Sequence, residues 1–170
     1  MLADKVALDT VWLTPEYVLD CVRAYFPRGF LDPATQPENP TAASTFWVEA
    51  DDGLSMPWGL YDVFVNPPYG KVLPKWVEKI GREAMGGATI IALFPGNRWE
   101  TKYLQTWFLR NPALKVICPK GPGRISFLRP DGKAAKQPNV PSIFYGFNVD
   151  PARFAEAFAP LGPCLGVNLL

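Results

Sequence analysis

The chain has 170 residues, of which 48% are hydrophobic and 14% aromatic, so it can fold around one core but has little room for a second large domain. It contains no histidine, which excludes Ser-His and Cys-His catalysis and histidine-metal sites. Its three widely spaced cysteines predict neither a disulfide framework nor a zinc cluster. Because no apolar run is long enough for a membrane span and residues 1–10 lack a secretory pattern, we expect a cytoplasmic protein.

The net charge of +1 conceals two segments of opposite charge. Residues 32–62 contain six acidic side chains and no Lys or Arg, whereas residues 119–142 contain five basic side chains and one Asp. The acidic segment suits a cationic ligand, and the basic segment suits a polyanion. Two solvated surfaces would give the same distribution, so charge alone leaves both interpretations open.

The first predicted element is an amphipathic helix that starts at the sequence TPEYV. Thr14 is a suitable N-cap, Pro15 suits the first helical position, and apolar side chains recur on one face as far as Phe26. The sequence GFLDPA then predicts a short buried strand that ends at Asp32. A polar loop follows to about residue 45.

Strand and helix patterns alternate through the middle of the chain. Residues 61–66 predict a strand that ends at Asn66, and residues 88–94 predict a fully buried strand. Between them, residues 73–85 predict a helix stopped by two glycines. The side chains expected on its inner face are Trp76, Val77, Ile80 and Ala84.

The last third of the chain predicts two helices and three strands. We expect helices over residues 99–111 and from Asp150 and Pro151 onward, the latter with Phe154, Phe158 and Leu161 on one side. The expected strands are residues 114–118, 123–129 and 142–148. The whole alternation favours an α/β fold with a mostly parallel central sheet and helices on both faces.

Ligands of open α/β sheets bind beyond the carboxyl ends of the strands. Asp32 and Asn66 are both expected at such ends, so we predict that they line one crevice. Asn66 begins the sequence NPPY, in which two consecutive prolines fix the backbone and give a stiff loop. Such a loop suits the holding of a flat polar ligand, although Asn-Pro also favours an ordinary turn.

The NPPY loop has the groups needed to alkylate the exocyclic amine of adenine. The lone pair of that amine is conjugated with the ring, so acceptors are needed that draw its two N–H bonds out of the ring plane. Asn66 offers a side-chain carbonyl and Pro67 a backbone carbonyl, while Tyr69 can stack on the base and Pro68 restricts the loop. Positioning and directed hydrogen bonds are then the main catalytic contributions.

NPPY at a strand end is the motif of amino methyltransferases that use S-adenosylmethionine, and the chain resembles the small phage-type DNA N6-adenine methyltransferases. The matching pieces span about residues 10 to 148 and are WLTPEYVLDCV, FLDPA, DDGLSMPW, VFVNPPYGK, GRISFLRPDG and VPSIFYGFN. The resemblance implies a Rossmann-like methyltransferase fold over residues 1–170, as a single domain with no separate target-recognition domain. It also implies S-adenosylmethionine as the cofactor, no metal and a catalytic loop of Asn66, Pro67, Pro68 and Tyr69.

The resemblance further assigns the cofactor and DNA contacts. The implied cofactor-binding residues are Thr14, Pro15, Asp32, Pro33, Ala34, Asp52, Gly53, Leu54 and Asn66. The implied DNA-binding residues are Lys71, Lys120, Arg124, Arg129, Lys133 and Lys136, and loops 34–45 and 119–141 are left to read the DNA sequence. The sequence FLDPATQPEN departs from methyltransferases at large because it lacks the usual glycine-rich turn. Glu49 and Asp51 are the candidates for a ribose-binding acid.

The implied reaction is direct methyl transfer to an adenine that is flipped out of duplex DNA. We expect double-stranded DNA as the partner, a monomer, and location in the host cytoplasm if a phage encodes the protein. Two alternatives stay open. One is an amino methyltransferase that acts on RNA, a protein glutamine or cytosine N4, and the other is a catalytically inactive module that binds nucleic acid through residues 119–141.

Overall fold

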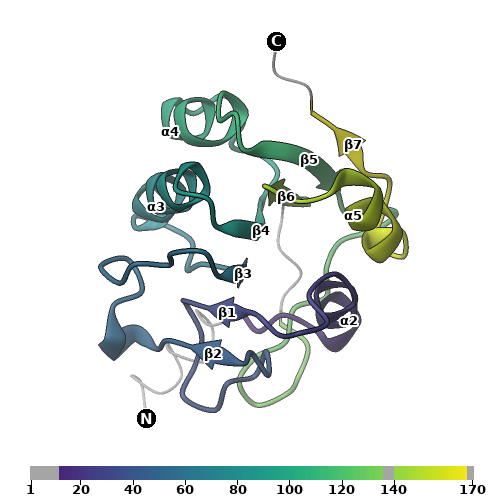
Figure 1. The fold of residues 1–170 in the computed structure, drawn as a ribbon. Coiled ribbons are helices and arrows are strands. Elements are labelled where there is room, and N and C mark those ends of the chain that lie inside the picture. Colours follow the sequence, from purple (N-terminus) through teal and green to yellow (C-terminus); the bar gives the residue numbers. More distant parts are fainter. Residues whose placement is uncertain (1–11, 136–139, 168–170) are drawn as a thin grey trace.

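The computed structural model describes residues 12–135 and 140–167, so Lys136 and the predictions for residues 1–10 lie outside the described residues (Figure 1). Helices, short helical turns and strands alternate along this part of the chain. Their bounds are α2 (Glu16–Tyr25), β1 (Leu31–Asp32), β2 (Thr45–Phe46), η1 (Glu49–Asp51), β3 (Asp62–Val65), α3 (Leu73–Met85), β4 (Thr89–Pro95), α4 (Lys102–Leu104), η2 (Gln105–Leu109), β5 (Leu114–Pro119), β6 (Ser142–Phe147), α5 (Pro151–Phe158) and β7 (Leu165–Gly166).

All seven strands join one sheet in the order β2-β1-β3-β4-β6-β5-β7. The pairs β1–β2, β1–β3 and β3–β4 are parallel, whereas β4–β6, β5–β6 and β5–β7 are antiparallel. The α/β class is therefore confirmed, but the prediction of a mostly parallel sheet is correct only in part. Strand β6 inserts between β4 and β5, which run in the same direction. It is antiparallel to both because the chain re-enters the sheet at the end where β5 stops, with Ile143 paired to Pro119.

Helices cover both faces of the sheet, as predicted (Figure 1). Alternate side chains of a strand point to opposite faces. On β4, Ile91 and Leu93 join the core under α2 and α5, whereas Ile90, Ala92 and Phe94 join the core under α3 and η2. The buried faces of α3 and α5 contain the apolar residues that the helical period predicts.

The start of the first helix differs from the prediction by one residue. Helix α2 begins at Glu16, and Pro15 is its N-cap in an extended conformation, with φ −71° and ψ 155°. Thr14 is therefore not the N-cap, and its hydroxyl has another partner. The prediction for the last helix is confirmed, since the side chain of Asp150 caps α5 by accepting a hydrogen bond of 2.8 Å from the backbone N–H of Arg153.

Other predicted elements differ from the structure where contacts with distant segments decide the local conformation. The predicted strand 123–129 is wrong: only Leu128 pairs, through isolated bridges to Leu13 and Ala134. The predicted helix 99–111 is shorter and consists of α4 followed by the π-helical turn η2. Strands β2 and β7 are only two residues long and show no sequence pattern. In the described part of the chain, no helix is long and apolar enough to cross a membrane.

Candidate active site

The two residues predicted to line one crevice lie at the carboxyl ends of β1 and β3. These strands are parallel neighbours in the sheet, with Leu31 opposite Val63. Asp32 is the last residue of β1, and Asn66 directly follows the last residue of β3. The structure therefore places the two polar side chains at the same edge of the sheet, as the sequence predicted.

Asn66 is half-buried, and its side chain is held by a residue far away in the sequence. Its Nδ2 donates a hydrogen bond of 3.2 Å to Oγ1 of Thr14. Thr14 is itself buried, with 8% of its surface exposed. Within the described residues, no hydrogen bond engages Oδ1 of Asn66.

The rest of the NPPY loop is partly covered. Pro67 is buried, Pro68 is exposed and Tyr69 is half-buried. The ring of Tyr69 packs against the core under α3 and meets Trp12 edge-on, with ring centroids 6.4 Å apart. Burial raises the pKa of Tyr69, so the phenol is neutral at physiological pH. The loop ends at Gly70, whose φ of +93° is a conformation that L-residues with side chains rarely adopt.

Asp32 is a buried carboxyl group, with 4% of its surface exposed. Its Oδ2 accepts a hydrogen bond of 2.8 Å from Thr41 Oγ1, and its Oδ1 accepts one of 3.1 Å from the backbone N–H of Ala34. Burial raises the pKa of Asp32 from 3.8 to about 6, and these two hydrogen bonds, together with the nearby hydroxyl of Thr35, oppose the shift. At pH 7.5 the group is therefore mostly an anion that is poorly solvated by water.

The raised pKa predicts how stability depends on pH. The folded protein binds a proton at Asp32 more tightly than the unfolded chain, so this contribution to stability is complete below pH 3.8 and is lost as the pH rises through about 6. A difference of this size corresponds to about 3 kcal/mol. Between pH 4 and pH 7.5, we expect the free energy of unfolding of the wild type to fall by up to that amount relative to Asp32→Asn. Urea denaturation at both pH values measures it, and parallel pH dependences of the two proteins would contradict the assignment.

The loops that follow β1 and η1 meet next to Asp32. Gly53 is buried, and a Cβ added to it would lie 2.0 Å from the backbone oxygen of Pro33, so only glycine permits this approach. Ala34 and Leu54 pack against the core under α3. Asp52 is exposed, and its φ of 51° turns the chain at the end of η1. The structure thus brings Pro33 and Gly53 into contact, although they are 20 positions apart in the sequence.

Sequence reasoning missed two polar residues beside Asp32. Thr41 donates to its carboxylate, and the buried hydroxyl of Thr35 lies near enough to lower the pKa of Asp32, although it forms no hydrogen bond within 3.5 Å among the described residues. A buried hydroxyl without a partner is costly, so this atom fits a site that a polar ligand completes. The only sequence signal was the concentration of Thr, Asn and Pro in the loop after a strand end.

The predicted DNA-binding residues differ in their surroundings. Lys71, Arg124 and Lys133 are exposed. Lys120 is half-buried, and its Nζ donates to the backbone oxygen of Pro122 at 3.0 Å. Arg129 is also half-buried and forms an ion pair of 3.1 Å with Asp131, which makes its guanidinium less available than the sequence suggested.

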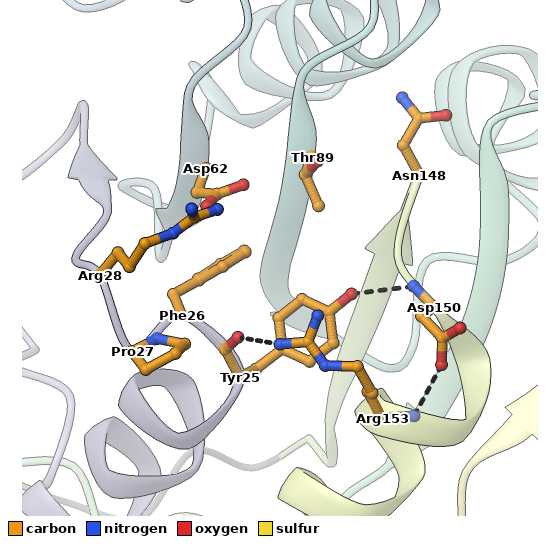
Figure 2. Close-up of a pocket in the computed structure, with 9 residues that line it drawn as sticks. All are labelled: Tyr25, Phe26, Pro27, Arg28, Asp62, Thr89, Asn148, Asp150 and Arg153. Carbon is orange, nitrogen blue, oxygen red and sulfur yellow. Dashed lines mark hydrogen bonds between the residues drawn. The ribbon is translucent and has the colours of Figure 1, made fainter.

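A pocket of about 520 Å³ lies at the opposite edge of the sheet (Figure 2). It is bordered by the end of α2 and by the amino ends of β3, β4 and α5, with Arg28, Asp62 and Arg153 among its lining residues. None of the predicted site residues lines it. In the described part of the chain, no group of three or more His, Cys, Asp or Glu residues is arranged to hold a metal ion.

The chain matches the model of a known protein family. The family model described as DNA N-6-adenine-methyltransferase (Dam) matches residues 3–148, which is most of the chain and includes every predicted site residue. No curated protein sequence matches the chain.

Proposed function

Because the chain belongs to the DNA N-6-adenine-methyltransferase (Dam) family, we propose that it transfers a methyl group from S-adenosylmethionine to the N6 amine of adenine within a specific DNA sequence. The observation that supports this most strongly is the NPPY loop at the carboxyl end of β3. There the amide of Asn66 donates to Thr14 through Nδ2, and Oδ1 has no hydrogen-bond partner among the described residues.

The residues of the loop prepare the adenine amine. Oδ1 of Asn66 and the backbone oxygen of Pro67 accept its two N–H groups, which draws the lone pair out of conjugation with the ring. Tyr69 offers part of its ring for stacking, and Pro68 keeps the loop stiff. An amine that has gained a methyl group is acidic enough to lose its proton to water or to a nearby carbonyl, so no strong general base is needed.

The residues around Asp32 fit S-adenosylmethionine, which when bound supplies an electrophilic methyl group on a sulfonium. The buried carboxylate of Asp32 is suited to the positive charge of its ammonium or sulfonium group. The partnerless hydroxyl of Thr35 offers a further polar contact. The Pro33–Gly53 contact and the half-buried Leu54 provide a close backbone surface and an apolar side chain for the adenine of the cofactor.

One hydrogen bond favours Glu49 over Asp51 as the ribose-binding acid. Both lie in η1, just beyond the carboxyl end of β2, which is the parallel neighbour of β1. The Oδ2 atom of Asp51 already accepts a hydrogen bond of 2.9 Å from the backbone N–H of Val48. We therefore propose Glu49, which is exposed, as the residue that binds the ribose hydroxyls. The parallel strands β2, β1, β3 and β4 support the further proposal of a Rossmann-like methyltransferase fold.

The experiment that tests this function supplies labelled S-adenosylmethionine with DNA, RNA and protein in parallel. Label in DNA alone is the expected result. Label in RNA or protein alone would favour the alternative that the loop serves another planar amine. If no substrate were labelled and S-adenosylmethionine gave no saturable thermal shift, the chain would instead be an inactive binding module.

We expect DNA binding to depend on two exposed cations, Lys71 directly after the NPPY loop and Lys133 in the basic segment. Removing both, by Lys71→Ala with Lys133→Ala, should weaken binding to any DNA sequence and reduce the slope of log K against log salt by roughly 1.8, since each phosphate contact contributes about 0.9. Fluorescence anisotropy at several salt concentrations measures the slope.

Arg110→Ala is the matched control for this double variant. Arg110 is exposed at the C-terminal end of η2, just before β5, and so lies at the edge of the sheet opposite to Asn66. An equal change of slope in the control and in the double variant would contradict the proposed DNA surface.

A further inference from the structure

We propose that Thr14 is a positioning residue that orients the side-chain amide of Asn66 for the acceptance of adenine N6 protons, and that residues 12–14 connect this amide to the basic loop (here residues 119–135). The inference rests on the proposed function. It assigns to Thr14 a role different from the cofactor contact that the sequence suggested.

The first observation is the hydrogen bond itself. Nδ2 of Asn66 donates to Oγ1 of Thr14 at 3.2 Å, and the two residues are 52 positions apart. A carboxamide has one donor and one acceptor end. When Thr14 accepts from the donor end, the plane of the amide is fixed and the acceptor end is left for the substrate. Since Asn66 is only half-buried, solvent would otherwise compete for both ends.

The second observation is the way in which Thr14 is held. It lies before α2, so its hydroxyl is not used to cap the helix. On its other side, Leu13 pairs with Leu128 through two backbone hydrogen bonds, of 2.7 Å from the Leu13 N–H and 3.0 Å from the Leu128 N–H. Thr14 is thus fixed between a helix start and a pair of hydrogen bonds to the basic loop, which restricts where its hydroxyl can lie.

The third observation extends the connection to Tyr69. The ring of Trp12 packs on Phe127 of the basic loop, with centroids 5.6 Å apart, and meets Tyr69 at 6.4 Å. Phe127 is buried in the core under α2, so the ring on which Trp12 packs is itself held in place. Residues 12–14 therefore contact both catalytic positions, Asn66 and Tyr69, and two neighbouring residues of the segment proposed to bind DNA.

Thr14→Val tests the role because valine keeps the shape of threonine and removes the hydroxyl. We expect kcat for DNA methylation to fall about tenfold, the effect of losing one hydrogen bond in a preorganised site. The Kd for S-adenosylmethionine should stay unchanged, and Thr14→Ser, which restores the hydroxyl, should recover most of kcat. The exchange of the Asn66 side-chain amide protons with solvent, followed by NMR, should become faster in Thr14→Val and stay slow in Thr14→Ser.

Two results would overturn the inference. One is a Thr14→Val enzyme with wild-type kcat, and the other is a raised Kd for S-adenosylmethionine with an unchanged kcat at saturation, which would make Thr14 a cofactor contact. If Thr14→Val did not fold, Thr14→Ala would take its place under the same criteria. If the wild type methylated no DNA, the proposed function would fail, but amide exchange would still test the contact between Thr14 and Asn66.

Discussion

Asn66→Ala should lower the rate of methyl transfer by about 10²–10³, or roughly 2.7–4 kcal/mol in transition-state stabilisation, as for other preorganised polar contacts. The substitution removes the side-chain carbonyl that we propose accepts an N6 proton, and it leaves the two prolines and Tyr69 in place. Because the adenine amine gains basicity only as its lone pair leaves conjugation, the loss should affect the chemical step. Single-turnover methyl transfer at saturating DNA and cofactor measures it.

Asn97→Ala is the matched control. Asn97 is an exposed asparagine in the loop after β4, and its removal should leave the rate within about twofold of the wild type. Near-full activity of Asn66→Ala would remove Asn66 from the mechanism. An Asn66→Ala protein that lost its thermal transition would be uninformative about the rate, so both variants are compared first by thermal melting.

Asp32→Asn should weaken the binding of S-adenosylmethionine by about 1.5–3 kcal/mol, the range for hydrogen bonds to charged groups. The change keeps the size of the side chain and removes the negative charge that we propose faces the cationic cofactor. Because the pKa of Asp32 is about 6, the wild type should also bind more weakly as the pH falls from 7.5 to 5, whereas the variant should show no such loss. Isothermal titration calorimetry at the two pH values measures both effects.

Glu38→Gln is the control for this variant. Glu38 is an exposed acid of the same acidic segment, and its neutralisation should change affinity little. A wild-type affinity that is independent of pH, or an Asp32→Asn protein that binds as tightly as the wild type, would contradict the cofactor role of Asp32.

Local sequence patterns were sufficient to predict the strand ends that form the site. The apolar run DVFV before Asn66 and the pair Leu31–Asp32 are strands in the structure. A short apolar run next to turn residues is typical of a buried strand. The buried face of α3 was predicted for the same reason, since its apolar residues recur with the helical period.

Long-range pairing was not predictable from such patterns. Residues 123–129 alternate like a strand, and Ile125 and Phe127 are indeed buried, but only Leu128 forms β-bridges, one to Leu13 before α2 and one to Ala134. The position of β6 likewise depends on a distant partner, because β6 pairs with β4 as well as with its neighbour in the sequence, β5. The contact between Thr14 and Asn66 was unpredictable for the same reason, because no local pattern in either segment indicates that the two residues meet.

The most direct test of the central claim is the identity of the methylated nucleoside. Unmethylated duplex DNA is incubated with the protein and labelled S-adenosylmethionine, digested to nucleosides and separated by chromatography, with Asn66→Ala in parallel. The account predicts label in N6-methyladenine for the wild type and a loss of about 10²–10³ in its rate of formation for the variant. Label in another nucleoside, or none in DNA while the cofactor still binds, would contradict it.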